Sequence, residues 1–272
     1  MKRHIKAFTY VDRYNIFLDI WMNYYTSFIL PKDILIMYRN SSGFDLQKYL
    51  AVRGWKSVEV VEVPTSSDQM VSAALFIETQ KYLLDNSDIV LYSDIDEIIF
   101  HKDLIGILNT FTDPFLTTTG FEIVQNIDKE DALSTYDEIV GQRRYGKFSE
   151  WYDKSVVLRS AVYWEDGKHS KNSTKNALDG LYLVHLNKID INILQQTNKQ
   201  TAQYYTTGVP HNRVSDIQEL IQHYELDRLE QLQQIPEDIS IYLKLNAITI
   251  HENRNNNSDL SEEGWDDSHL PN

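Results

Sequence analysis

The chain of 272 residues contains no cysteine, only six prolines and ten glycines, and fewer basic than acidic side chains. Without cysteine there is no disulfide, no thiolate nucleophile and no cysteine-bound zinc, and this composition fits a reducing compartment. The 26 lysines and arginines stand against 40 aspartates and glutamates, which gives a formal charge of −14. This balance argues against nucleic acid or an anionic membrane surface as the main partner.

Long hydrophobic runs are also missing. No stretch of eighteen apolar residues occurs, and the longest candidate, residues 16–30, is interrupted by Asp19, Asn23 and Ser27. We therefore expect neither a transmembrane segment nor a secretory signal. A cytoplasmic location is expected, and a peripheral contact with the inner face of a membrane is compatible with it, although no strongly basic amphipathic helix is visible.

Glycine-rich phosphate loops are absent as well. Neither G-x-G-x-x-G nor G-x-x-x-x-G-K-[ST] follows the first predicted strand. A Rossmann dinucleotide site and a P-loop are therefore not expected, and a phosphate-bearing ligand would have to be held in another way.

What the chain does have is a regular alternation of strand and helix patterns. Hydrophobic side chains make up 42% of it, enough to bury a large core. Four short apolar runs are typical of strands: residues 5–11, 33–39, 57–63 and 89–92. The segments between them include apolar residues at helical spacing. This order predicts an α/β fold with a mainly parallel central sheet flanked by helices.

The fourth of these runs ends in a cluster of carboxylates. Ile89 to Tyr92 reads as a buried strand, and Asp94, Asp96 and Glu97 follow at once. In open α/β sheets ligands bind beyond the carboxyl ends of the strands, where such side chains can hold a divalent cation. The plainer interpretation of this Asp-x-Asp-Glu motif is a solvated turn.

Four segments taken together resemble glycosyltransferases of the GT-A fold, and most of all the family 2-like and family 92-like enzymes. They are the D-x-D-E motif at 94–97, the lysine-bearing strand at 154–159, Gly-Lys-His at 167–169 and Leu-Val-His-Leu at 183–186. The resemblance covers about residues 4–190. Those families often carry Arg-Asn-Glu after the first strand, whereas this chain has Tyr-Val-Asp-Arg-Tyr at 10–14.

The resemblance implies a GT-A-like catalytic domain at residues 1–190, with a donor-binding half at about 1–100 and an acceptor half at about 101–190. Residues 191–252 are expected to form a C-terminal helical cap, because apolar residues recur there at helical spacing. The acidic, polar residues 253–272 are expected to form a flexible tail. Residues 126–147 are polar and predict a mobile loop, or else an exposed helix and connector.

The resemblance also implies a divalent metal, Mn²⁺ or Mg²⁺, held by Asp94, Asp96 and His185. Both ions prefer oxygen ligands shared between one or two carboxylates and substrate phosphates, and neutral imidazole can ligate Mn²⁺. Asp96 is the first choice for a direct ligand, whereas Asp94 would bind through water or accept a hydrogen bond from the ribose. For His185 the alternative is a core histidine satisfied by the backbone.

Several residues are candidates for binding the nucleotide-sugar donor. They are Thr9, Tyr10, Val11, Arg13, Asn40, Gln69, Asp94, Ile95, Lys154 and His169. Tyr10 would stack on the base, the backbone at Val11 would pair with its edge, and Lys154 would reach the diphosphate. Each candidate also has a plainer interpretation. The residues near the end of the first strand would simply pack in the core, His169 would lie in a solvated loop, and Lys154 would lie at the edge of a strand.

An inverting transferase needs a carboxylate that takes the proton of the acceptor hydroxyl. The candidates are Asp179, Asp166 and Glu122. Asp179 is preferred because it opens the strand that leads to His185, although a turn residue in Leu-Asp-Gly is the plainer interpretation. The choice of inversion over retention rests on the family resemblance alone.

The sequence thus predicts a metal-dependent, hexosyltransferase-type enzyme that moves a sugar from a nucleoside diphosphate donor, with a UDP-sugar favoured, to a glycan or glycolipid acceptor. The resemblance points to bacterial surface polysaccharide or lipopolysaccharide synthesis. Two alternatives remain, a nucleotidyltransferase on a similar sheet and a catalytically inactive carbohydrate-binding protein. The first would be expected to show a glycine-rich loop after the first strand, and the second would lack metal dependence.

Overall fold

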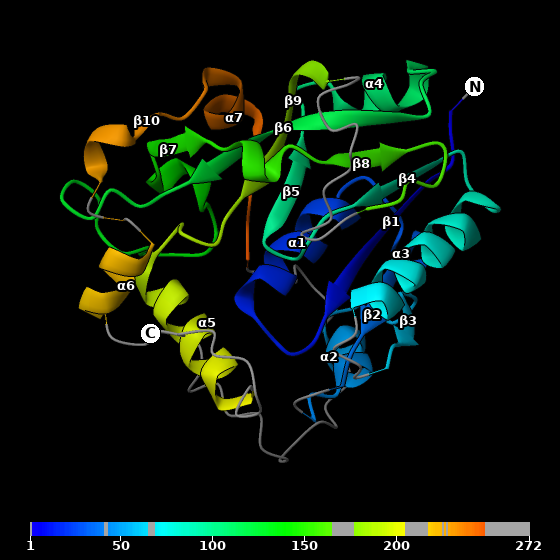
Figure 1. Ribbon diagram of the computed structural model, residues 1–272, viewed down its shortest axis with the longest axis horizontal. Helices are drawn as coiled ribbons and strands as arrows, with labels where there is room; N and C mark the ends of the chain where they lie inside the picture. Colours follow the sequence, from blue (N-terminus) through cyan, green and yellow to red (C-terminus); the bar gives the residue numbers. More distant parts are fainter. Residues whose placement is uncertain are drawn as a thin grey trace, which may run out of the picture.

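The computed structural model arranges ten strands in one sheet with helices packed around it (Figure 1). It describes residues 2–40, 43–64, 69–164, 177–204, 217–224, 226 and 228–247. The predicted tail at 253–272 and two of the predicted site residues, Asp166 and His169, lie outside this description.

The N-terminal part follows the expected alternation of strands and helices. Its elements are β1 (Ile5–Val11), α1 (Ile16–Thr26), β2 (Ile34–Tyr38), α2 (Leu46–Val52), β3 (Glu59–Glu62), α3 (Gln69–Leu84) and β4 (Ile89–Tyr92). The four strands pair in parallel in the order β4-β1-β2-β3, so their carboxyl ends share one edge of the sheet. The predicted α/β class, with parallel strands flanked by helices, is confirmed.

The rest of the chain extends this sheet mostly with antiparallel pairs. The elements are β5 (Glu97–Phe100), α4 (Leu104–Thr110), β6 (Phe115–Ile123), β7 (Tyr145–Phe148), β8 (Ser155–Leu158), β9 (Ala177–His185) and β10 (Gln233–Gln234). Strand β8 pairs with β4 and with β6 and so joins the two halves. Strand β9 runs antiparallel to β5 and parallel to β6. This mixed arrangement sets the positions of the candidate site.

Helix α1 is fixed to the end of β4 by buried hydrogen bonds. The side chain of Asn15 caps the helix by accepting from the Phe17 amide at 2.8 Å. Trp21 donates from Nε1 to the Ser93 hydroxyl at 2.8 Å, and the Tyr25 hydroxyl lies 2.9 Å from the same oxygen. Because Ser93 directly precedes the predicted D-x-D-E motif, the packing of α1 holds the start of this motif in place.

Within the described residues, the α-helices after β9 are α5 (Ile191–Tyr204), α6 (Ile217–His223) and α7 (Glu237–Tyr242). Helices α5 and α6 lie on the side of β7 and β10, away from α2 and α3 (Figure 1). A small second core there contains Val124, Leu194, Leu220 and Leu226. In the part of the chain that the structure describes, no helix is long and apolar enough to span a bilayer.

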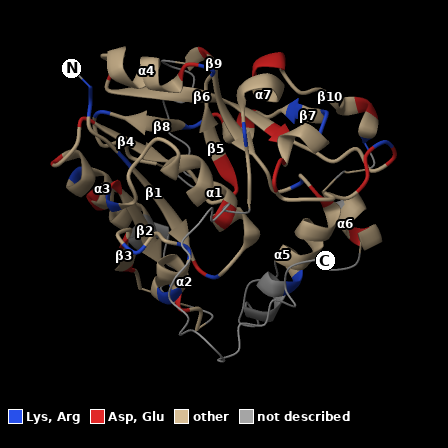
Figure 2. Ribbon diagram, turned by 180° about the vertical axis from the view of Figure 1, so that it is seen from behind, with Lys and Arg blue, Asp and Glu red and all other residues tan. Residues whose placement is uncertain are grey.

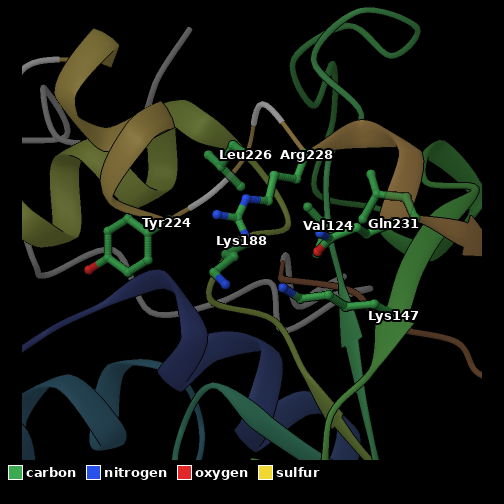
Figure 3. Close-up of a pocket in the computed structure, with 8 residues that line it drawn as sticks. Val124, Lys147, Lys188, Tyr224, Leu226, Arg228 and Gln231 are labelled. Carbon is green, nitrogen blue, oxygen red and sulfur yellow. The ribbon is translucent and has the colours of Figure 1, made fainter.

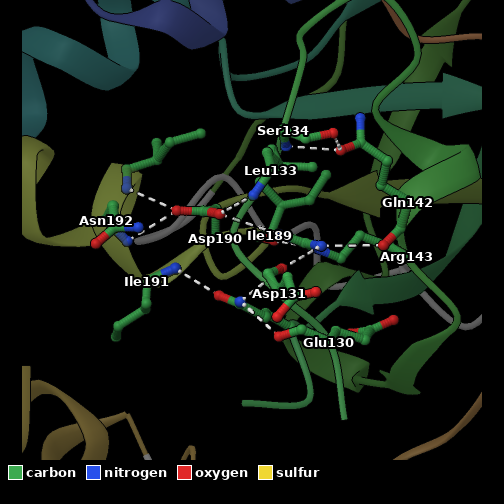
Figure 4. A network of polar contacts seen from close by, with 12 residues as sticks. Glu130, Asp131, Leu133, Ser134, Gln142, Arg143, Ile189, Asp190, Ile191 and Asn192 are labelled. Atoms are coloured by element: carbon green, nitrogen blue, oxygen red, sulfur yellow. Dashed lines mark hydrogen bonds and ion pairs between the residues drawn. The ribbon is translucent and has the colours of Figure 1, made fainter. Parts of the chain in front are cut away.

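Residues 126–147, expected to form a mobile loop, are instead attached to the start of α5 by a buried polar network (Figure 4). The Arg143 guanidinium lies 3.0 Å from Oδ2 of Asp190, and both side chains are almost fully buried. The same Asp190 oxygen accepts from the Leu133 amide at 2.7 Å, while its Oδ1 accepts from the Asn192 amide at 2.8 Å. One carboxylate therefore holds the loop and caps the helix at once.

This network predicts that Asp190→Asn destabilises the fold strongly. The substitution leaves the buried Arg143 charge without its counter-ion, which typically costs about 3–5 kcal/mol of unfolding free energy. Urea denaturation measures the loss. Glu138→Gln is the control, because Glu138 forms an exposed pair with Lys244 at 3.5 Å that is expected to contribute about 0–1 kcal/mol. Equal effects of the two substitutions would contradict the role given to the buried pair.

Candidate active site

Strand register brings the charged residues together at the middle of the sheet. In the antiparallel pair of β4 and β8, Leu91 lies opposite Val157, so three residues further on Asp94 meets Lys154. In the pair of β5 and β9, Glu97 lies opposite His185, and in the pair of β6 and β9, Glu122 lies beside the same histidine. Figure 2 shows acidic residues at the start of β5 in the centre of the molecule.

Lys154 lies beneath the acidic turn rather than out in solvent. Its amine lies 2.5 Å from Oε1 of Glu97 and 3.5 Å from Oδ2 of Asp94, and the residue is 4% exposed. Burial alone would lower the pKa of Lys154, but the two carboxylates outweigh it and raise the pKa above its usual range. The Tyr92 hydroxyl donates to the other Asp94 oxygen at 2.6 Å. Lys154 therefore offsets part of the negative charge of the motif.

His185 is held from behind by Glu122. Its Nδ1 lies 3.1 Å from Oε1 of Glu122, and the ring of Tyr152 stacks on the imidazole with centroids 4.0 Å apart. Lys188 donates to the other Glu122 oxygen at 3.0 Å. Burial would raise the pKa of Glu122, but the hydrogen bond from His185 and the charge of Lys188 lower it to about 2.

The other imidazole nitrogen points at Asp96. Nε2 of His185 lies 3.5 Å from Oδ2 of Asp96, and the Asp96 side chain is 27% exposed, so it is open to a ligand. Burial would lower the pKa of His185, but its hydrogen bonds with Asp96 and Glu122 raise it to about 9. A positive charge is therefore favoured between Asp96 and His185.

The donor set fits a divalent cation that shares its ligands with a substrate. Within the described ranges, no group of three or more histidine, aspartate and glutamate side chains is arranged to hold a metal ion. Asp96 and His185 supply one oxygen and one nitrogen, and Mg²⁺ commonly takes only one or two carboxylates besides water and phosphates. Glu122 on the far nitrogen of His185 is the partner that metal-bound histidines usually have. Asp94, already bonded to Tyr92 and Lys154, lies beside this pair.

The predicted base and ribose residues lie at the carboxyl edge of β1 and β2. Tyr10 lies two residues beyond Phe8, which pairs with Tyr92, and is therefore level with Asp94. The Arg39 guanidinium lies 5.9 Å from the Tyr10 ring centroid. This places an aromatic ring and a cation beside the acidic motif.

Three charged residues near Tyr10, namely Asp12, Arg13 and Arg39, form a small cluster. Asp12 lies 3.3 Å from Arg39 and 3.5 Å from Arg13. The Asn40 side chain accepts from the Tyr38 hydroxyl at 3.2 Å and from the Gly43 amide at 3.1 Å, so it shapes the turn after β2. Asp12 and Arg39 were not predicted as site residues, although Asp12 follows a predicted strand and Arg39 ends one, which was a usable signal.

The remaining candidates for donor binding are buried, already hydrogen-bonded or not described. Thr9 is fully buried in β1, and its hydroxyl has no hydrogen-bond partner within the described structure. The Val11 carbonyl accepts from the Arg39 amide at 2.9 Å, so this part of its backbone is already bonded. Gln69 begins α3, but its side chain lies outside the description. Ile95 is half-buried in the turn before Asp96.

Of the candidate bases, the structure describes Asp179 and Glu122, and these two do not meet at one point. Asp179 is exposed near the start of β9, six residues before His185 and within the stretch where the register of β9 against β6 shifts. Its neighbour Gly180 packs against His101, just beyond the far end of β5. Glu122 is next to His185 but is 1% exposed and bonded on both oxygens. The preference for Asp179 therefore lacks support from geometry.

Tyr152, which the sequence does not single out, is placed by a glycine. A Cβ atom on Gly120 would lie 2.3 Å from the Ser149 carbonyl oxygen and 2.6 Å from the Tyr152 Cβ. The short helical turn Glu150–Tyr152 can therefore approach β6 only because residue 120 has no side chain. The Tyr152 hydroxyl also lies 3.4 Å from Oε1 of Glu122.

No protein-family model matches the chain, and a search of the curated proteins found no match. Among solved structures, the chain is similar to residues 1–349 of S. aureus TarS, with 13% identity over 74% of this chain and 67% of that one and a TM-score of 0.35. It is also similar to the mannosyltransferase PcManGT from Pyrobaculum calidifontis, with 12% identity over 84% and 72% and a TM-score of 0.38.

A third similar structure is glucosyl-3-phosphoglycerate synthase from Mycobacterium tuberculosis, with 16% identity over 44% of each chain and a TM-score of 0.29. TarS was solved with UDP-GlcNAc, PcManGT with GDP-Man and Mn²⁺, and the synthase with UDP and Mn²⁺. All three TM-scores lie below 0.5, so the likeness carries no argument about the activity of this chain.

The raised pKa of His185 predicts how stability changes with pH in metal-free protein. A group whose pKa rises on folding stabilises fully below its ordinary value, here 6.5, and this contribution is lost as the pH rises through about 9. The unfolding free energy should fall over this window by on the order of 3 kcal/mol because of His185. Urea denaturation with a chelator, from pH 6 to pH 9.5, measures the slope.

His185→Gln should flatten this slope, because glutamine does not titrate. His4→Gln serves as the control, since the His4 side chain is 49% exposed and pairs with Asp33 at 2.9 Å. An unchanged slope in His185→Gln would refute the charge assigned to the Asp96 and His185 pair.

Proposed function

We propose that this chain is a metal-dependent glycosyltransferase that moves a sugar from a nucleoside diphosphate donor to an acceptor hydroxyl. The observation that carries the proposal is the contact between Asp96 and His185, with Glu122 fixing the imidazole and Asp94 beside it. This pair lies where the carboxyl ends of β4 and β1 meet, the edge at which open α/β sheets bind ligands.

The chain's own residues would hold the donor from two sides. Tyr10 and the basic residues Arg13 and Arg39 flank the acidic motif at the ends of β1 and β2, where a base and a ribose would lie. Asp94 is held by Tyr92 and Lys154, but its side chain is still 27% exposed. It can therefore accept a hydrogen bond from a ribose hydroxyl. A UDP-sugar remains the favoured donor.

Mn²⁺ or Mg²⁺ at Asp96 and His185 would neutralise the negative charge that grows on the departing diphosphate. Glu122 orients the imidazole of His185, and Tyr152 covers its face. Lys154 supports the acidic turn from below, so the motif keeps its shape without a bound ligand. Lys154 is thus a positioning residue here, rather than the direct diphosphate contact expected from the sequence.

The finer parts of the proposal rest on the sequence resemblance. They are transfer of a hexose with inversion, a glycan or glycolipid acceptor, and a role in bacterial surface polysaccharide or lipopolysaccharide synthesis. The cytoplasmic location follows from the composition, and a peripheral contact with the inner face of a membrane is compatible with it. Inversion requires a base among Asp166, Asp179 and Glu122. Because Glu122 is bonded to cations and Asp179 lies next to Gly180, which packs near His101 beyond the far end of β5, Asp166 is the candidate that we propose.

Asp96→Asn should abolish the metal-dependent binding of a nucleoside diphosphate. Calorimetry and thermal shift with UDP and GDP, each with and without Mn²⁺, should show stabilisation of the wild type by mass action. The variant should lose this response and lower donor turnover by on the order of 10²-fold or more. Asp113→Asn, which removes one exposed charge elsewhere, should behave as the wild type. A wild type that responds to no nucleotide with metal would remove the transferase assignment.

The base is tested by comparing Asp166→Asn with Asp179→Asn. Loss of a general base should lower turnover by about 10²–10⁴-fold while donor affinity is kept. We expect this result for Asp166→Asn, and near-normal turnover for Asp179→Asn. A selective loss of turnover in Asp179→Asn would return the role to Asp179 and contradict the position argument.

A further inference from the structure

Trp151 is the most exposed large hydrophobic side chain in the described part of the chain. It lies in the short helical turn Glu150–Tyr152, and the residue is 76% exposed. Aromatic side chains bury about 150–250 Å² each inside proteins, so this indole keeps more than half of such an area for a ligand. What that area serves depends on where the turn lies in the sheet.

The antiparallel pairing of β8 with β4 places the turn at the ligand-binding edge. Leu91 lies opposite Val157, so the residues before β8 extend beyond the carboxyl end of β4. The acidic motif at 94–97 follows the same end, and Lys154 contacts two of its carboxylates. Ligands of open α/β sheets bind at this edge. Trp151 comes three residues before Lys154 and therefore lies beside the proposed reaction site.

The turn is bonded on both sides to one residue of β6. The Gly120 amide donates to Oδ1 of Asp153 at 2.7 Å, and the Gly120 carbonyl accepts from the Ser149 amide at 3.0 Å. These bonds restrict the backbone on either side of Trp151 before any ligand arrives. Binding to a surface that is already ordered costs less conformational entropy, so the turn is suited to hold a ligand.

Tyr152 links the turn to the proposed metal ligand. Its ring stacks on the imidazole of His185 with centroids 4.0 Å apart, and Glu122 holds the same imidazole from behind. Figure 3 shows the amines of Lys147 and Lys188 pointing toward the same place, and both contact Glu122, at 3.8 Å and 3.0 Å. The cations behind His185 are thus engaged with Glu122, and the turn is the surface beside His185 that is open to an acceptor.

The surroundings of the indole favour a sugar over an apolar partner. Glu150, directly before Trp151, is exposed. The nearest exposed aromatic in the sequence, Phe148, lies opposite Phe121 in the pairing of β6 and β7, so it points to the other face of the sheet from Glu122. One indole beside a carboxylate offers a stacking face and a hydrogen-bond acceptor, whereas a protein or lipid surface would require a larger apolar patch.

We infer, resting on the proposed glycosyltransferase activity, that Trp151 is the platform on which a sugar ring of the acceptor stacks. The C–H groups on one face of a pyranose carry partial positive charge, and the face of an indole is negative, so the two surfaces attract each other. Tyr10 and Arg39, proposed to bind the donor, lie at the ends of β1 and β2, whereas the turn lies on the β6 and β8 side of the acidic motif. The acceptor is therefore a saccharide rather than an alcohol without a ring.

Ligand-observed NMR tests the inference on the full chain, with saturating UDP and Mg²⁺ so that the donor site is filled. The probes are the methyl glycosides of glucose, galactose, mannose and N-acetylglucosamine, and sorbitol is the alcohol with similar hydroxyls but no ring. At least one glycoside should bind, and sorbitol should not bind detectably. Trp151→Ala should raise the Kd of that glycoside by about tenfold or more, because the apolar stacking surface is lost. Trp151→Phe keeps an aromatic face and should recover most of the affinity.

Tyr82→Ala is the matched control, because Tyr82 is a 50% exposed aromatic whose hydroxyl lies 3.2 Å from Glu59 at the start of β3, on the opposite edge of the sheet. It should bind the glycosides as the wild type does. Equal Kd values for the wild type and Trp151→Ala, equal binding of sorbitol, or no glycoside binding by a wild type that responds to UDP would each overturn the platform alone. Absence of any UDP response in the wild type would overturn the transferase proposal, and with it the role of the bound sugar as an acceptor.

Discussion

The contact between Glu122 and His185 is the interaction on which the rest of the site depends. It joins β6 to β9, and Glu122 also binds Lys188 beyond the end of β9. Because the carboxylate holds Nδ1, the Nε2 atom of His185 is presented to Asp96. A buried glutamate of this kind is stable only among several cations, and the lowered pKa of Glu122 reflects that environment.

The strand and helix alternation of the first hundred residues was predictable, because parallel strands buried on both faces produce uninterrupted apolar runs. The same logic found Asp94 and Asp96, since the end of β4 is a fixed place in such a sheet. It did not find β9 between β5 and β6, because pairing between distant segments leaves no local pattern. Asp179 was preferred because the segment leading to His185 was recognised as a strand, whereas the direction and length of that strand within the sheet were not.

The ion-pair partners of the charged residues could not be predicted from the sequence either. Lys154 was expected at the diphosphate, but antiparallel register with β4 places its amine beneath Glu97 and Asp94. Local sequence predicted that Lys154 begins a strand, one residue before β8 starts at Ser155, and said nothing about which strand it would meet. The turn that carries Trp151 reaches the same edge through the pairing of β8 with β4, so no local motif indicates its position.

The buried pair of Arg143 and Asp190 also links regions that look separate along the chain. Asp190 lies two residues after Lys188 and five after His185, and it holds the loop of residues 126–147. Opening that loop would expose a buried charge and release the cap of α5. The loop, the helix and the end of β9 therefore form one cooperative unit, and thermal fluctuations that loosen any of them would loosen the imidazole as well.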